Sequence, residues 1–258
     1  MNEELRNHII NLLNKGVRLD GRKPLEYRKP VDIKYDFSKS AEGSARVQIG
    51  ETVVIAGVKL ATQEPYPDSP EEGCLMVNAE LLPISNPEFE TGPPGIDAIE
   101  ISRVVDRGIR ESKAIDMKKL CVEKGEKVWS VMIDICPLND AGNLFDISAL
   151  SALAALKNTK FPKTDKEGTI DYKNKTDKSL SLDKQTVSVT VCKIGDHLIV
   201  DPITEEEKVI DARMTIATDQ NQNLCAMQKG GDSPLTEEEI SKMVDIGVKK
   251  CDELRKAL

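Results

Sequence analysis

Apolar residues in the first fourteen positions recur every three to four residues, the period of a helix with one buried face. Gly16 ends this pattern, as is common just beyond a helix C-terminus. A short amphipathic helix that packs against the rest of the chain is therefore predicted. The residues on its apolar face are Leu5, Ile9, Leu12 and Leu13.

From Asp32 onward the apolar residues alternate with polar ones, which is the period of a half-buried strand. Gly50 and Glu51 separate residues 45–49 from residues 52–60, a pattern typical of a β-hairpin with a tight turn. A third strand is predicted over residues 74–82. Strands, beginning with an antiparallel pair, therefore open the fold after the first helix.

A long loop rich in proline and glycine covers residues 83–98, and loops of this kind often carry functional residues. The periodicity then predicts a helix over residues 96–113, a buried strand over 127–136 and a helix of small residues over 146–156. These segments indicate a β-α-β-α unit.

Residues 157–186 are polar and rich in lysine and show no packing periodicity, so a surface excursion or lobe boundary is predicted there. The final helix is predicted over residues 235–256, where Thr236 precedes Glu239 by three residues in a capping box. The second half thus repeats the order of strands followed by a helix, which indicates an α+β fold with mixed sheets and packed helices. The strands predicted before the final helix are 187–191, 197–200, 212–217 and 224–227.

The composition of the 258 residues limits the function. With 39% hydrophobic and 31% charged residues the chain is globular, and its net charge of -8 means that any site for a polyanion must be local. No apolar run reaches the ~20 residues needed to cross a bilayer, and no signal-peptide pattern opens the chain, so a cytoplasmic protein without membrane contact is predicted. Six cysteines without a CxxC pair, and His8 far from His197, predict no disulfide framework, metal site or histidine catalysis.

Arg103, Arg107 and Arg110 are spaced four and three residues apart within the helix predicted over residues 96–113. This spacing places them on one face, opposite the apolar residues, in an exposed row that we call the arginine stripe. A guanidinium group stays charged and donates two parallel hydrogen bonds to a phosphate, so the stripe favours a site for a phosphate backbone. An alternative stays open, in which nearby acids pair with the arginines on an ordinary solvated face. These acids are Glu100, Asp106 and Glu111.

The segment 136–149 ends a strand, turns at Gly142 and begins a helix near Asp146. Free N–H groups at a helix N-terminus bind anions. However, Asp146 is the predicted N-cap, accepting from the N–H of Ser148 or Ala149, and residues 139–156 contain no lysine or arginine. An internal aspartate cap is therefore predicted here rather than a phosphate site.

Residues 201–211, which we call the acidic segment, contain five carboxylates. Such clusters can bind Mg²⁺ or act as general acid and base. Most acidic loops do neither and are solvated, which is the interpretation favoured here, because without a cation the segment would repel a polyanion. The five acids are Asp201, Glu205, Glu206, Glu207 and Asp211.

Three motifs in a specific order carry a resemblance to a known family. They are Arg18–Arg22 (RLDGR), Gly43–Val47 leading into the Gly50-Glu51 turn, and Arg103–Ser112 (RVVDRGIRES). From about Leu12 to the last helix the chain resembles the RNase PH family. Within it, the chain is most similar to the non-catalytic ring subunit of the archaeal RNA exosome, through the arginine run, the GPPG loop before it and the N-terminal helix.

The resemblance implies two-layer β-α lobes of the RNase PH-like, ribosomal protein S5 domain 2-like kind. Residues 1–30 would form a helix and an arm, residues 31–165 the N-terminal lobe and residues 166–258 the C-terminal lobe of one compact subunit. It further implies pairing with a catalytic RNase PH-like subunit, three pairs closing a hexameric ring for 3′-to-5′ phosphorolytic RNA degradation. RNA-binding cap subunits and single-stranded RNA are the other implied partners.

The resemblance also assigns residue roles. Catalytic relatives carry a phosphate-binding arginine in the strand-to-helix turn, whereas the matching residues 142–146 here have none, and a catalytic aspartate falls on Glu205, six residues before Asp211. This implies no catalytic residue, no metal and no cofactor in this chain, and RNA-backbone contacts by the arginine stripe, Arg103, Arg107 and Arg110. Two alternatives remain: an active phosphate-dependent exoribonuclease that uses Glu205 and Asp211, and a scaffold whose arginines are merely solvated.

Overall fold

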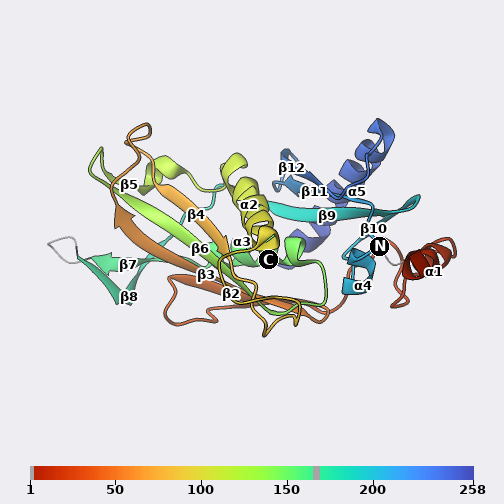
Figure 1. The fold of residues 1–258 in the computed structure, drawn as a ribbon. Helices are drawn as coiled ribbons and strands as arrows, with labels where there is room; N and C mark the ends of the chain where they lie inside the picture. Colours follow the sequence, from red (N-terminus) through yellow and green to blue (C-terminus); the bar gives the residue numbers. More distant parts are fainter. Residues whose placement is uncertain (1–2, 165–168) are drawn as a thin grey trace.

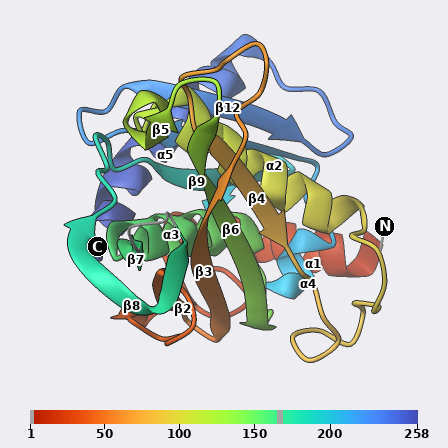
Figure 2. The same cartoon turned by 90° about the vertical axis from the view of Figure 1, so that its left-hand side faces the viewer.

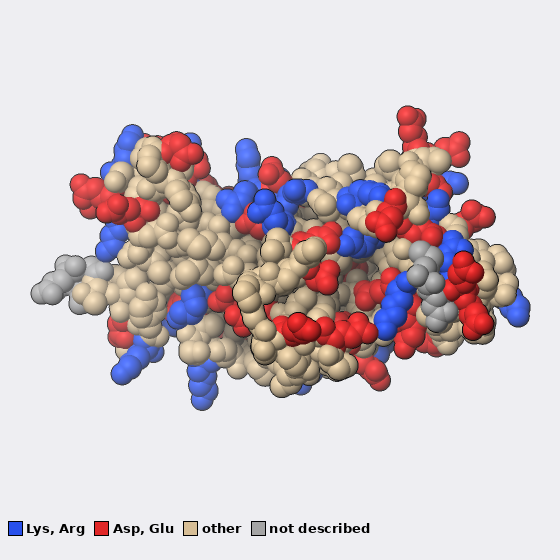
Figure 3. Space-filling model, viewed as in Figure 1, with Lys and Arg blue, Asp and Glu red and all other residues tan. Residues whose placement is uncertain are grey.

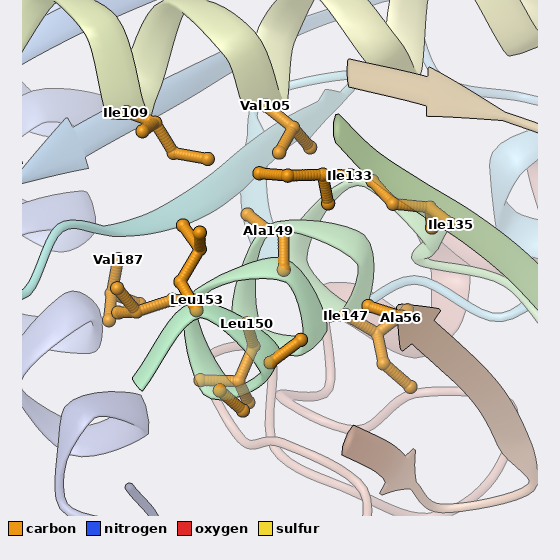
Figure 4. Packing of buried hydrophobic residues seen from close by; sticks show 14 of the residues in the cluster. Ala56, Val105, Ile109, Ile133, Ile135, Ile147, Ala149, Leu150, Leu153 and Val187 are labelled. Atoms are coloured by element: carbon orange, nitrogen blue, oxygen red, sulfur yellow. The ribbon is translucent and has the colours of Figure 1, made fainter. Parts of the chain in front are cut away.

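Helix α3 (Leu144–Lys157) lies at the centre of the protein, between two sheets. The computed structural model describes residues 3–164 and 169–258. α3 is apolar on all sides, so it can be stable only where other elements cover it completely. It packs against β2 and β3 of one sheet and β9 of the other. Figure 4 shows its side chains Ile147, Leu150 and Leu153 pointing into the cluster that joins the two halves.

The larger sheet has the strand order β1 (Val31–Tyr35), β2 (Gly43–Ile49), β3 (Thr52–Gln63), β6 (Lys127–Asn139) and β4 (Cys74–Ala79), with β5 (Cys121–Glu123) also on β6. β4 runs parallel to β6 and the other pairs are antiparallel. The smaller sheet is antiparallel, in the order β10 (His197–Val200), β9 (Val187–Ile194), β11 (Ala212–Thr218) and β12 (Leu224–Gly230).

The remaining helices cover these sheets. α2 (Ile96–Glu111) packs on β4 and α3 and also reaches β12 (Figure 2), while α5 (Glu237–Arg255) packs on β9 and β11. Gly247 lets α5 approach β11 closely, since a Cβ there would lie 2.9 Å from the Ile216 side chain. The short helix α4 (Thr204–Glu207) lies within the acidic segment, and α1 (Glu3–Leu13) packs in a separate apolar cluster with Ile194 and Ile199.

The structure confirms the predicted α+β class, the first helix, the hairpin at Gly50, the arginine-bearing helix and the capping box of Thr236 and Glu239. The third strand ends at Ala79, earlier than predicted. The surface excursion predicted at residues 157–186 contains two strands that were not predicted, β7 (Lys160–Thr164) and β8 (Ile170–Ser179). Their side chains are mostly polar on both faces, so the alternation that identifies a strand is missing. The short elements β5, α4 and η1 (Met117–Leu120) were not predicted.

The predicted lobe boundary between residues 165 and 166 lies outside the described residues, and the division into an arm and two lobes stays a prediction. The central cluster contains residues of both sheets, including Val54 and Ile133 of the larger one and Val189 and Ile216 of the smaller one. Among the described residues, no helix is long and apolar enough to cross a membrane.

Candidate functional site

The apolar face of α2 determines which way the arginine stripe points. Ile101, Val104, Val105 and Ile109 are buried against β4 and α3, which is the face the sequence predicted. Rotation by about 100° per residue then carries positions 103, 107 and 110 to the opposite side. All three arginines are exposed, and Figure 3 shows Lys and Arg side chains gathered over α2.

The three arginines differ in their partners. The Arg103 side chain makes no hydrogen bond or ion pair within the described residues, and Arg107 donates from Nη1 to Gln228 Oε1 of β12 at 2.6 Å. Arg110 pairs with Asp106 at 2.7 Å, which raises the pKa of the Arg110 guanidinium, and it also donates to Leu75 O at 3.1 Å. Pairing with an acid, the alternative considered from sequence, therefore applies only to Arg110.

Glu100 and Glu111 do not neutralise the stripe. Glu100 accepts from Arg213 of β11 at 2.7 Å, and the Arg213 guanidinium also lies 4.6 Å from the centre of the Phe145 ring. Glu111 forms no ion pair within the described part of the chain. Two exposed guanidinium groups, those of Arg103 and Arg107, thus remain available to an external anion.

The turn into α3 is built differently from the prediction. The N-cap is Asn143, in the left-handed conformation at φ 63°, and not Asp146, so that prediction is wrong. Asparagine tolerates this conformation because its side chain is short and polar. The helix consequently begins at Leu144, two residues before Asp146.

Asp146 is completely buried within the first turn of α3 and accepts three hydrogen bonds. The donors are the Tyr27 hydroxyl at 2.6 Å, Thr190 N at 2.7 Å and Asn143 Nδ2 at 3.2 Å. Removal from water raises the pKa of Asp146 to about 7. The hydrogen bonds of Asp146 therefore join α3 to β9 and to Tyr27 of the arm, the segment that follows the N-terminal helix.

An internal carboxylate does occupy the N-terminus of α3, but it belongs to Glu207. Asn143 N donates to Glu207 Oε1 at 2.8 Å, and Gly142 N donates to Asp140 Oδ1 at 2.9 Å. Although Glu207 is exposed as a residue, desolvation of its carboxyl by the surrounding protein raises the pKa of that group to about 7. Glu207 lines a cleft of about 620 Å³ together with Asp140, Phe145 and Arg213. A phosphate would meet two carboxylates here.

The interpretation of the acidic segment as a solvated loop is wrong for most of its acids. Asp201 and Glu206 are fully buried. Asp201 pairs with Arg28 at 2.7 Å and with Arg22 at 2.9 Å, while Glu206 accepts from Arg18 Nε at 3.0 Å and also pairs with its Nη2.

The two remaining acids of the acidic segment, Asp211 and Glu205, differ in exposure. Asp211 pairs with Arg6 of α1 at 3.0 Å, whereas Glu205 is exposed and accepts from the Thr204 hydroxyl. The acidic segment therefore anchors the N-terminal helix and the arm, residues 14–30. The described residues contain no group of three or more His, Cys, Asp or Glu placed to bind a metal ion.

Sequence reasoning missed Arg28 and did not place Glu207 beside Asn143 at the N-terminus of α3. Arg28 donates to Ala141 O at 2.5 Å and to Gly142 O at 3.0 Å, so it supplies a cation to a turn that has none of its own. The available signal was complementary charge, since three arginines lie in the arm and five acids in the acidic segment. The six cysteines are free thiols.

Comparison with known proteins places this geometry in a family. The model for domain 1 of the 3′ exoribonuclease family RNase PH matches residues 27–162, and the model for domain 2 matches residues 184–250. The exosome complex component Rrp42 of Methanopyrus kandleri is 41% identical over 98% of this chain and 95% of its own length. The Rrp42 component of Archaeoglobus fulgidus is 46% identical over 97% and 94%, respectively.

Solved structures of exosome chains also have the same fold as this chain. A chain of the Archaeoglobus fulgidus exosome with RNA bound to the active site superposes with a TM-score of 0.90 at 45% identity, covering 98% of this chain and 97% of that one. A chain of an archaeal exosome core gives a TM-score of 0.86 at 42% identity, covering 98% and 96%. The chain belongs to the RNase PH family of 3′ exoribonucleases.

Proposed function

We propose that this chain is a non-catalytic ring subunit of an archaeal exosome. It pairs with a catalytic RNase PH-like subunit, and three such pairs form a hexameric ring that degrades RNA from the 3′ end by phosphorolysis. Rrp42 exosome components are similar to this chain over nearly its full length, which supports the assignment. Cap subunits and single-stranded RNA are its further partners, and the cytoplasm is its location.

The observation that carries the RNA-guiding role is the exposed pair Arg103 and Arg107, neither of which has a carboxylate partner among the residues that the structure describes. With a rise of 1.5 Å per residue, their Cα atoms lie about 6 Å apart along the helix axis, so the two side chains can bind neighbouring phosphates. Such contacts hold an RNA strand in place without reading its bases. Binding should therefore depend on salt and tolerate any sequence.

The second half of the proposal is that the subunit itself does not catalyse phosphorolysis. Phosphorolysis brings a phosphate anion next to a phosphodiester, and this requires cations at the reacting groups. At the N-terminus of α3 the neighbouring groups are Glu207 and Asp140, while Arg28 is engaged by Asp201 and by backbone carbonyl groups. Glu205 and Asp211, the acids of the alternative enzyme, have no free cation beside them in the described structure.

Charge reversal tests the guiding role. The double variant R103E/R107E should assemble with the catalytic subunit into a ring of unchanged size but capture a labelled single-stranded RNA at least tenfold more weakly at low salt. The control is K242E/K249E, which makes the same charge change on exposed positions of α5. Equal RNA binding by the two double variants would favour the scaffold alternative.

Catalysis is tested separately. The full chain alone, incubated with phosphate and single-stranded RNA, should release no nucleoside diphosphate, whereas the mixture with its catalytic partner should do so. Release by the chain alone, retained after removal of any contaminating ribonuclease, would establish the alternative of an active exoribonuclease.

A further inference from the structure

The two-stranded sheet formed by β7 and β8 is positively charged, although the chain as a whole is acidic. These strands carry five lysines and two aspartates, a net charge of +3, whereas the whole chain has -8. In Figure 1 they lie at the opposite end of the molecule from α1. We call this sheet the basic hairpin. Its lysines are Lys160, Lys163, Lys173, Lys175 and Lys178.

Within residues 3–164 and 169–258, no acid forms an ion pair with the lysines of the basic hairpin. All of these lysines but Lys175 are exposed. Asp171, one of the two acids of these strands, accepts instead from Lys173 N at 3.0 Å and Asn174 Nδ2 at 2.8 Å. By contrast, Lys124 and Lys193 elsewhere on the surface are paired with acids.

An exposed aromatic ring lies among these lysines. Tyr172 of β8 is 46% exposed, and Lys59 of β3 lies over its ring, 4.7 Å from the centroid. The ring has no second aromatic or cationic contact in the described part of the chain. Nucleic-acid bases stack on rings presented in this way, with little preference for sequence.

The basic hairpin is anchored at its base. Phe161 is buried and meets Trp129 of β6 edge to face, with the ring centroids 5.3 Å apart. The Thr176 hydroxyl donates to Phe161 O at 2.8 Å. Two-stranded hairpins are marginally stable alone, so this anchor is what holds β8 in place even though none of its side chains is buried. An ordered strand with only exposed or half-buried side chains is available for a partner.

We propose that the basic hairpin is a second RNA-binding surface, separate from the arginine stripe. Its lysines bind the phosphate backbone of single-stranded RNA, and Tyr172 stacks against a base. The choice of RNA as the polyanion rests on the proposed function. The combination of unpaired lysines with an exposed ring favours nucleic acid over an acidic protein, because a ring that stacks a base adds nothing to carboxylate binding.

The test is the triple variant K160E/K163E/K173E of the full chain, whose three lysine side chains are exposed and form no hydrogen bond or ion pair in the described structure. Anisotropy of a labelled oligoadenylate is titrated over a series of salt concentrations. We expect binding about tenfold weaker at low salt, and a slope of log K against log salt that is smaller by about 2, since each single-strand phosphate contact contributes ~0.7. Y172A should weaken binding further, and Y172F should not.

The matched control is K242E/K249E/K256E, which changes the charge equally on exposed positions at α5 and its C-cap. A neutral triple variant, K160Q/K163Q/K173Q, removes the same three contacts and should show a similar change in slope with a smaller loss of affinity, and the melting temperatures of all variants show whether they fold. Wild-type RNA binding by the folded K160E/K163E/K173E variant would overturn the proposal. If that variant lost only its binding to a cap subunit, the basic hairpin would be a protein-binding surface and the proposal would also be wrong.

These outcomes are independent of the arginine stripe. If R103E/R107E loses RNA and the hairpin variants do not, the proposed function stands and this inference fails. If both sets bind RNA normally, the proposed function fails as well.

Discussion

Two groups of three arginines in this chain have opposite surroundings. Arg103, Arg107 and Arg110 of the arginine stripe are exposed, and in the described part of the chain only Arg110 is paired with an acid. In the arm, Arg18 and Arg28 are buried and Arg22 is nearly so, and each of the three is held by acids. The same side chain therefore serves as a structural anchor in one region and as an available cation in the other.

The two groups of arginines differ because different parts of the protein lie against them. The arm lies against the acidic segment, so its guanidinium groups are matched to Asp201 and Glu206 during folding. The stripe lies on the solvent side of α2, where the nearest acids are engaged elsewhere or reach only Arg110. An arginine count along a sequence thus says little about binding until the positions of the acids are known.

The largest effect is expected from breaking the buried pair. Arg18→Ala leaves Glu206 buried without its cation and removes the donors to Val200 O and Asp201 O, so the free energy of unfolding should fall by about 3–5 kcal/mol. Urea denaturation measures this change. Arg103→Ala is the matched control and should lie within about 0.5 kcal/mol of wild type. Equal stability of the two variants would refute the contrast between the two groups.

Asp146 is a buried acid that has no arginine partner in the described structure, so it can be compared with the buried acids that pair with the arm. The pKa of Asp146 is raised to about 7 in the folded protein, above its ordinary value of 3.8. The folded state therefore binds a proton that the unfolded state has lost, and stability falls as pH rises between these values. Between pH 5 and pH 7 wild type should lose about 2 kcal/mol relative to Asp146→Asn, because the slope of ~1.4 kcal/mol per pH unit falls off as the folded-state pKa is reached.

Denaturant midpoints of both proteins across this pH range measure the effect. Asp171→Asn, a change at an exposed acid, should leave the pH dependence of wild type unaltered. A constant difference between wild type and Asp146→Asn at all pH values would show that Asp146 keeps its charge in the folded state.

The smallest effect on stability is expected from removing the acid that pairs with Arg110. Asp106→Ala removes the ion pair with Arg110, a surface pair that contributes only about 0.3–0.5 kcal/mol to the free energy of unfolding. The freed Arg110 should then strengthen RNA binding by a few-fold at low salt. Glu111→Ala removes one negative charge from the same helix but no ion pair, so it should change RNA binding less. Equal gains from both variants would attribute the effect to net charge alone.

Much of the fold was predictable because it depends on local pattern. The buried face of α2, the turn at Gly50 and the capping box of Thr236 and Glu239 are each encoded by residues close together in the chain, and all three predictions are confirmed. β7 and β8 were missed because both of their faces are mostly polar. The N-cap of α3 was misplaced because Asp146 is a common capping residue, whereas Asn143 adopts its role through a left-handed backbone conformation.

The sequence by itself determined the family resemblance, the order of most helices and strands, and the face of α2 on which the arginine stripe lies, because these depend on motifs and on the helical and strand periods. Only the tertiary structure decided which charges are available. The contacts of Arg28 with Asp201, of Asn143 with Glu207 and of Tyr27 with Asp146 join residues 173, 64 and 119 positions apart. Pairing across such separations depends on the packing of the arm, α3 and the acidic segment, which no local pattern records.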